Sequence, residues 1–511
     1  MKWQPRFVIL FFLALIVGVP VVMNRVVRLT GSSTGMTGPG EKLTILTPHG
    51  EQIRYEFGRA FNLWRQQQGR TLVQLDWRAS GGTSDLRRLV FDQFNAKISQ
   101  GREDEGIESD LFFGGGAYEH GRLARGITTY RDGQTVSIPL SVPVQMPQGL
   151  LEQVYPQPNI GSEPLYDPQL RWLGVVLSSF GIVYNRDTLR GLGLDTPRQW
   201  SDLVDGRYLR WVALADPAHS GSIAATYNAI LRREGWDEGW KLLRRVFANA
   251  RYFTSSASKV PVDVSSGEAA AGMCIDFYGR FQSGAIGGDR VGYVDPRHMT
   301  AVTADPVSIL RGAPNLDLAN QFVLWLLSPA AQNLWQKKRH TPGGPERFEL
   351  RRLPIRRDLY AGSVMQQWVD DVQPFEIARA FPDGMPNFYA AIAPLAHVMA
   401  IDVHADLQAA WQAIVDQRDP RIKQLMVEQF DAMPQELRVR WPDSDLALNW
   451  RGMLENPNAL RHAEVRLVLR RFMDSIKQRM KDRELFYEDR LRWGAFFRAQ
   501  YRQTVRIARA Q

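Results

Sequence analysis

From residue 42 onward, hydrophobic and polar positions alternate with two periods, about 2 and about 3.6 residues, and these predict strands and helices in alternation. A short apolar run at Leu43–Thr47 predicts a strand that ends at a Pro-His-Gly break. Tyr55–Gln67 repeats large apolar residues about every 3.6 positions, which places them on one face of a helix. Thr71–Trp77 alternates with a period of about two and predicts a second strand. Alternating strands and helices are typical of an α/β fold with a largely parallel sheet.

The same alternation returns after an irregular, proline-rich stretch at 138–168, and then gives way to helices alone. Beyond residue 360 only helical periods persist, so we expect a helical C-terminal region. Further strands are predicted at Phe180–Tyr184, Trp211–Leu214, Gly272–Phe277, Val291–Val294 and Val302–Leu310, and further helices at Leu86–Ile98, Ser222–Glu234, Trp236–Asn249 and Asn320–Lys337.

The N-terminus has the features of an export signal. Lys2 and Arg6 precede the uncharged apolar run Phe7–Met23, which as a helix would span roughly 25 Å, near the lower limit for a bilayer. Neither a small-residue cleavage triplet nor a cysteine for lipid attachment follows the run. We therefore favour a signal anchor over a cleaved signal peptide at 1–28, with a flexible spacer at 29–41 and a folded body held outside the cytoplasm at the membrane.

Composition narrows the function classes. The chain has 511 residues, which indicates two or three domains, and one cysteine, Cys274, which excludes a disulfide framework and multi-cysteine metal sites. The net charge is +9, but residues 461–511 hold 14 Lys/Arg against 6 Asp/Glu and so carry most of the surplus. Because the rest is nearly balanced, nucleic-acid binding is not indicated; the basic tail is either a solvated helix face or a contact for lipid or protein.

Small-residue turns follow several predicted strands and open the next helix. Ligands of open parallel sheets bind beyond the carboxyl ends of the strands, and a helix N-terminus there can hold an anion. For any one of these turns a plain helix cap is the better explanation, and the binding interpretation depends on three turns in equivalent positions. The candidate residues in these turns are Ser80, Gly81, Gly82, Thr83, Gly115, Asp216, Ser220, Gly221 and Ser222.

Four further polar side chains follow predicted strands: His49, Glu51, Asp276 and Tyr278. They offer imidazole, carboxylate and phenol groups, which either bind a hard metal or hydrogen-bond a polar solute. The sequence contains no G-x-S-x-G, H-E-x-x-H or P-loop motif, and Cys274 lies in an apolar strand. We therefore expect a protein that is not an enzyme and that needs no cofactor.

Several segments in order resemble the extracellular solute-binding proteins of bacterial ABC importers, in particular the group of ferric-iron-binding periplasmic proteins. They stand at 43–51, 109–116, 178–187, 216–222, 265–273 and 311–322. The resemblance implies a two-lobed periplasmic-binding-protein fold, type II-like, that closes on its ligand and partners a membrane permease. Lobe one would comprise 42–177 and 300–350, lobe two 178–299, and a helical extension 351–511.

The resemblance also bears on the ligand. His49 matches a histidine of the iron-binding pattern, but Phe277-Tyr278 offers one tyrosine where that pattern has two, and the acid position falls within Gly114–Gly116. Ferric iron, held by His49 and Tyr278, is thus less favoured than a phosphonate, sugar phosphate or carboxylate. The alternative is a membrane-tethered signalling or scaffold protein whose C-terminal helices dock a partner.

Overall fold

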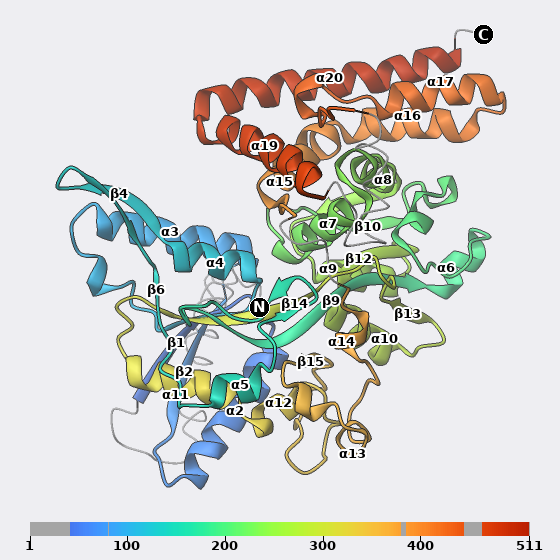
Figure 1. The fold of residues 1–511 in the computed structure, drawn as a ribbon. Helices are drawn as coiled ribbons and strands as arrows, with labels where there is room; N and C mark the ends of the chain where they lie inside the picture. Colours follow the sequence, from blue (N-terminus) through green and yellow to red (C-terminus); the bar gives the residue numbers. More distant parts are fainter. Residues whose placement is uncertain (1–40, 80, 380–384, 444–461, 510–511) are drawn as a thin grey trace, which may run out of the picture.

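Strand β9 (Leu173–Asn185) crosses the middle of the molecule and is buried over all 13 of its residues. It pairs with β14 (Val302–Leu310) in one lobe and with β12 (Ala271–Ile275) in the other, and so joins two α/β lobes (Figure 1). Eleven strands form one sheet through both lobes. This computed structural model describes residues 41–79, 81–379, 385–443 and 462–509.

The α/β fold with a helical C-terminal region, expected from the sequence, is confirmed by this arrangement. The predicted membrane helix at 1–28 and the spacer at 29–41 fall outside the described residues, apart from Glu41. The residue limits of the lobes given above remain predictions.

Lobe one contains a sheet in the order β14-β3-β1-β2, with β1 parallel to both β2 and β3. One apolar cluster joins α2, α11 and α12 to one face of this sheet, and a second joins α3 and α4 to the other. The elements are β1 (Glu41–Leu46), α2 (Glu51–Gln67), β2 (Val73–Arg78), α3 (Thr83–Ile98), η1 (Glu103–Glu105), β3 (Leu111–Phe113), α4 (Ala117–Arg125), β4 (Ile127–Arg131), β5 (Gln134–Ile138), β6 (Ser141–Val142), α5 (Leu150–Val154), β7 (Asn159–Ile160), β8 (Glu163–Pro164), α11 (Leu316–Leu326), α12 (Pro329–Leu334) and β15 (Leu353–Pro354).

Lobe two repeats the parallel arrangement, with β10 between β11 and β12. The crossing strand β9 closes this sheet in antiparallel pairing with β12 and β13. The elements are α6 (Arg186–Gly191), η2 (Trp200–Val204), η3 (Gly206–Tyr208), β10 (Val212–Ala215), α7 (Gly221–Glu234), α8 (Trp236–Asn249), β11 (Ala250–Thr254), α9 (Lys259–Ser266), α10 (Asp276–Ile286) and β13 (Val291–Val294).

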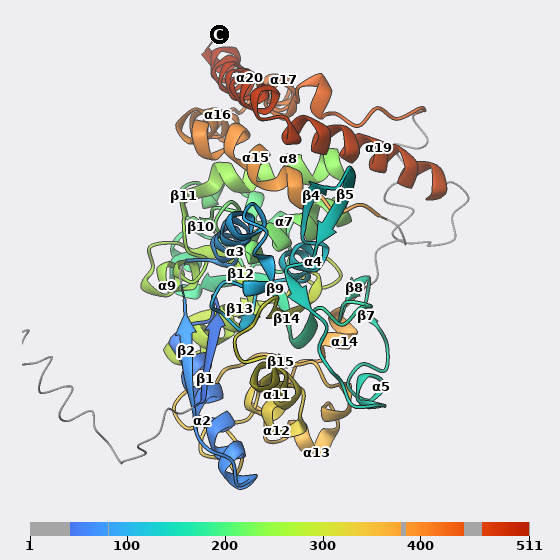
Figure 2. The same ribbon diagram turned by 90° about the vertical axis from the view of Figure 1, so that its left-hand side faces the viewer.

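The C-terminal helices from α15 onward lie on the side of α7 and α8 and share the hydrophobic core of lobe two, whereas α14 packs against the lobe-one cluster (Figures 1 and 2). The Trp236 ring of α8 lies 5.3 Å from the Phe388 ring and 5.0 Å from the Phe472 ring. The elements are η4 (Arg357–Leu359), α13 (Gly362–Met365), α14 (Pro374–Ile377), α15 (Tyr389–Met399), η5 (Ile401–Val403), α16 (His404–Asp416), α17 (Pro420–Asp431), η6 (Gln435–Leu437), α19 (His462–Lys481) and α20 (Arg483–Arg509).

Several local predictions differ from the structure; the strand predicted at Gly272–Phe277, for example, ends at Ile275, directly before α10 begins. The single helix predicted at Asn320–Lys337 is two helices, α11 and α12, because Pro329 cannot continue a helix and instead opens α12 behind the Ser328 cap. The strand predicted at Phe180–Tyr184 begins earlier, at Leu173, since a strand buried on both faces shows no alternation to mark its start.

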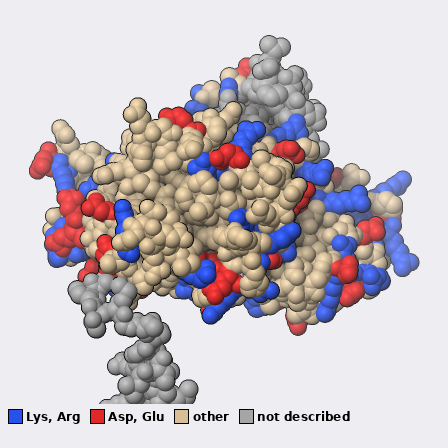
Figure 3. Space-filling model, turned by 90° about the horizontal axis from the view of Figure 1, so that it is seen from below, with Lys and Arg blue, Asp and Glu red and all other residues tan. Residues whose placement is uncertain are grey.

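The segment Tyr389–Asp416 is long and apolar enough to cross a membrane by composition alone. Half of its most apolar window is buried, and Leu395, Met399, Leu407 and Ile414 belong to the lobe-two core. We interpret it as a core element. The view from below shows acidic and basic side chains interspersed, in agreement with the near balance of charge outside the tail (Figure 3).

Candidate functional site

A cavity of about 390 Å³ lies between the two lobes. The turn at 81–83 of lobe one meets the turn at 216–222 of lobe two: a Cβ added to Gly82 would collide with the carbonyl oxygen of His219. His219 Nδ1 also lies 3.4 Å from Asp85 Oδ1 on α3. The structure therefore brings together the small-residue turns that the sequence placed at the ends of two separate groups of strands.

Three helices begin at this cavity. Thr83 opens α3, Gly116 precedes α4 and Gly221 opens α7; all three residues line the cavity. The first N–H groups of a helix have no acceptor within that helix, and the helix dipole adds positive potential at the same end. Two lobes thus direct positive helix ends at one space, an arrangement suited to an anion.

Glycine is required beside these helix ends. Gly115 has φ +108°, a left-handed conformation that side chains rarely adopt, and a Cβ there would collide with the methyl group of Thr83. The Gly114 carbonyl accepts from Nε2 of the buried His120 on α4 at 3.1 Å, and His120 Nδ1 lies 2.7 Å from Ser308 Oγ. Burial lowers the His120 pKa to about 4, so a neutral imidazole holds the glycine turn in place.

The cavity base contains a buried cation. Arg352 is fully buried; its guanidinium donates to His49 Nε2 at 2.9 Å and to Ser178 Oγ at 2.7 Å, and pairs with Asp305. Burial alone would raise the Asp305 pKa, but Arg352 and His49 lower it to about 2. The His49 pKa is lowered, first by burial, which keeps this imidazole neutral.

Aromatic rings hold the guanidinium from the other side. The Arg352 carbon Cζ lies 4.2 Å from the Phe277 ring centre, on α10 of lobe two, and 5.2 Å from that of Trp335 in lobe one. Arg352 therefore contacts groups from both lobes, and its neighbours His49, Ser178, Phe277 and Asp305 line the cavity.

A second acid, Glu119, lies at the cavity beside the start of α4. It is 5% exposed, and burial raises the pKa of its carboxyl group. At another edge of the cavity, Arg232 of α7 and Glu163 of β8 form an ion pair between the lobes. The cavity thus combines positive helix ends with a buried carboxyl group whose pKa is raised by burial.

Six of the sequence-predicted residues line the cavity: His49, Thr83, Gly115, Gly221, Ser222 and Tyr278. Gly81 and Gly82 shape the turn before α3, and Ser220 caps α7 by accepting from Ile223 N at 3.3 Å. Glu51 is exposed at the start of α2, and Ser80 lies outside the described residues.

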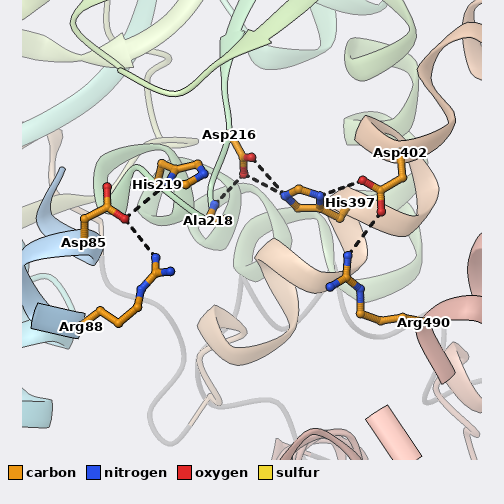
Figure 4. A network of polar contacts seen from close by, with 8 residues as sticks. All are labelled: Asp85, Arg88, Asp216, Ala218, His219, His397, Asp402 and Arg490. Atoms are coloured by element: carbon orange, nitrogen blue, oxygen red, sulfur yellow. Dashed lines mark hydrogen bonds and ion pairs between the residues drawn. The ribbon is translucent and has the colours of Figure 1, made fainter. Parts of the chain in front are cut away.

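The two predicted aspartates, Asp216 and Asp276, are not among the residues that line the cavity. Asp216 accepts from Ala218 N at 2.7 Å and pairs with His397 Nε2 of α15 at 3.1 Å, and His397 Nδ1 in turn lies 2.9 Å from Asp402 (Figure 4). Asp276 is buried, accepts from its neighbour's N–H at 2.8 Å, and has a pKa raised to about 7 by burial. Asp216 is therefore bound within the protein, whereas the Oδ2 atom of Asp276 is buried without a hydrogen-bond partner among the described residues.

The sequence did not indicate several residues that line the cavity. They are Glu119, Ser178, Arg232 and Asp305, and from the C-terminal region Met385, Asn387 and Tyr389. A local signal existed for Glu119 alone, because it stands three residues after the Gly116 cap, the spacing of a capping box. The others occupy apolar or unremarkable stretches and become neighbours only through the fold.

A two-lobed α/β body with a polar cavity between its lobes is an arrangement that can close around a small ligand. Residues 144–356 match the family model described as bacterial extracellular solute-binding protein. This stretch of the chain is therefore similar to an extracellular solute-binding domain, and the resemblance inferred from the sequence is confirmed for it.

Curated relatives match a shorter stretch. The phosphoglycerate transport regulatory protein PgtC of Salmonella typhimurium is 26% identical over 162 residues, which are 32% of this chain and 40% of that protein. An uncharacterized protein of Haemophilus influenzae is 29% identical over 165 residues, 32% of this chain and 47% of its own. The chain thus spans less than half the length of these relatives.

Solved structures with a similar course of the chain include the periplasmic binding protein AfuA and the protein HitA. AfuA from Actinobacillus pleuropneumoniae, with fructose-6-phosphate bound, aligns with TM-score 0.49 and 17% identity, covering 73% of this chain and 98% of that one. Iron-bound HitA from Pseudomonas aeruginosa aligns with TM-score 0.47 and 16% identity, covering 66% and 92%.

Proposed function

We propose that this protein captures a small anionic solute, with a sugar phosphate, phosphorylated acid, phosphonate or carboxylate as the favoured class, and delivers it to an ABC permease. The observation that carries the proposal is the convergence of α3, α4 and α7 on one cavity, with Thr83, Gly115 and Ser222 at their starts. Phosphate oxygens accept hydrogen bonds from such backbone N–H groups and from hydroxyls. The permease and anchorage of the N-terminus in the cytoplasmic membrane belong to the same proposal.

The cavity favours an organic anion over bare ferric iron. To bind a metal ion, His49 must offer a ring nitrogen with a free lone pair, yet its Nε2 already accepts from the Arg352 guanidinium at 2.9 Å. The positive charge of Arg352 would also repel a metal cation at this position. Among the described residues, no group of three or more His, Cys, Asp and Glu side chains is arranged to hold a metal ion. Of the tyrosine pair in the iron-binding pattern only Tyr278 is present here, and burial raises its pKa.

The match to the Salmonella protein adds a specific ligand to the list. Its name refers to phosphoglycerate, a small phosphorylated acid of the favoured class. The family match also favours solute capture over the scaffold alternative, and a capture role requires no catalytic group.

Ligand binding to the native state tests the proposal. Thermal shift and calorimetry on the purified full chain would compare 3-phosphoglycerate, fructose 6-phosphate, 2-aminoethylphosphonate, citrate and ferric citrate. A ligand at 100 times its Kd adds about 2.7 kcal/mol to native stability, which raises the Tm by several degrees. We expect one of the phosphorylated or phosphonate compounds to give this shift.

A matched pair of variants locates the binding. Thr83→Val removes a hydroxyl at the start of α3, whereas Thr128→Val removes one from an exposed position of β4. The first should weaken binding by about fivefold, the worth of one hydrogen bond, and the second should leave it unchanged. A panel in which ferric citrate alone stabilises the protein would refute the anion proposal, and a panel with no response would refute capture of these solutes.

A further inference from the structure

Among the described residues, the C-terminal region contributes the short segment 385–389 to the lining of the cavity. Met385, Asn387 and Tyr389 all line the cavity, although they lie beyond the part of the chain that matches the solute-binding family. The segment connects to α15, which packs on α7 of lobe two. The cavity therefore has a third wall in addition to the two lobes.

Phe388 fixes this wall. Its side chain is fully buried in the lobe-two core, and its backbone N–H donates to Asn228 Oδ1 at 2.8 Å. Asn228 itself lies on α7 and lines the cavity. Because Phe388 is anchored inward, its neighbours Asn387 and Tyr389 are held at the cavity surface.

Two further contacts tie the wall to both lobes. The Tyr389 ring stacks on the Tyr118 ring of α4, with centres 4.6 Å apart and planes at 22°, and so reaches lobe one. About two helical turns further along α15, His397 pairs with Asp216, which lies in the turn before α7 of lobe two (Figure 4). The wall is therefore attached to lobe two and contacts lobe one at the cavity.

The chemistry of the wall differs from that of the helix ends. Asn387 offers a neutral amide, and burial together with Glu163 and Glu119 raises the Tyr389 pKa well above its ordinary value, so the phenol stays neutral. Neutral amide and phenol groups hydrogen-bond the hydroxyls and carbonyls of an organic solute, and they lack the positive potential that the helix ends direct at a phosphate. The helix ends and the wall thus suit two different parts of one ligand.

We propose that the C-terminal region completes the binding site, with Asn387 and Tyr389 as specificity-determining residues that bind the hydroxyl-bearing part of a phosphorylated solute. This inference rests on the proposed function, in which the helix ends bind the phosphate. It assigns to the C-terminal region a contribution to ligand choice in addition to its packing on lobe two. Inorganic phosphate has no hydroxyl-bearing organic part, so we expect its affinity to be independent of Asn387 and Tyr389.

The experiment compares three probes on the full chain: fructose 6-phosphate, 3-phosphoglycerate and inorganic phosphate. Asn387→Ala and Tyr389→Phe remove the polar groups of the wall, and Tyr487→Phe removes a hydroxyl from a residue that is 66% exposed on α20. We expect the affinity of the organic phosphate that binds the native protein to fall about fivefold or more in each wall variant. Inorganic phosphate affinity should stay within about twofold, and the control should match the native protein.

The outcomes separate the two proposals. Unchanged organic phosphate affinity in both wall variants overturns the inference and leaves the proposed function standing. Equal losses for inorganic and organic phosphate also overturn it, because the wall would then act through the fold; the Tm of each variant without ligand reports that effect directly. If the native protein binds none of the probes, the anion proposal and the inference fall together.

Discussion

Removal of the buried cation at the cavity base should destabilise the protein strongly. Arg352 is fully buried and its guanidinium contacts His49, Ser178 and Asp305. Arg352→Met keeps an apolar side chain between the Phe277 and Trp335 rings but leaves the Asp305 carboxylate without its cation. Breaking a buried ion pair on one side costs about 3–5 kcal/mol, and we expect a loss in this range at pH 7.

The loss should depend on pH with a definite sign. In the native protein the folded pKa of Asp305 is depressed to about 2, so its contribution is present above its ordinary value of 3.8 and is lost as the pH falls toward 2. Without Arg352, burial raises the folded pKa of Asp305, so stability is greatest below the unfolded pKa and falls as the pH rises. The difference between native and variant should therefore shrink as the pH is lowered from 7 to 4.

Guanidinium chloride unfolding followed by tryptophan fluorescence measures these differences. Asp305→Asn on the Arg352→Met background removes the stranded charge and should recover at least about 1 kcal/mol of the loss. The reasoning is refuted if Arg352→Met costs less than about 1 kcal/mol, or if the two substitutions are simply additive.

Three further predictions concern other parts of the fold. The pKa of His397 is raised by its hydrogen bonds to Asp216 and Asp402. The stability that His397 contributes is therefore full below the unfolded pKa of about 6.5 and is lost as the pH rises through the folded pKa. We expect His397→Gln to lower the Tm more at pH 6 than at pH 9. Equal effects at both pH values would contradict this. Phe388→Ala should cost about 3–5 kcal/mol in denaturant unfolding, because it opens a cavity in the core shared by lobe two and the C-terminal helices, and a loss below about 1 kcal/mol would argue against a shared core. Cys274 is fully buried and burial raises its thiol pKa, so a thiol reagent should label it only after unfolding; rapid labelling of the native protein would show the thiol to be accessible.

Local patterns account for much of the architecture. The predicted bounds of β13, β14 and α8 agree with the structure, since apolar periodicity there is interrupted by clear turn residues on both sides. The helix at Asn320–Lys337 was wrong because periodicity alone ignored Pro329. For the site, glycines after strands led to Gly115 and Gly221, because ligand-facing turns need small residues next to the chain positions that form them.

The sequence by itself determined the alternation of strands and helices, the small-residue turns at the starts of α3, α4 and α7, and the resemblance to solute-binding proteins. Only the tertiary structure decided which polar groups are partners. Asp216 pairs with His397, 181 positions away in the sequence, and Arg352 donates to His49, 303 positions away. The tertiary structure also decided that residues 385–389 reach the cavity. The physical reason is that burial periodicity is encoded over one or two helical turns, whereas the partner of a polar group depends on how distant elements pack.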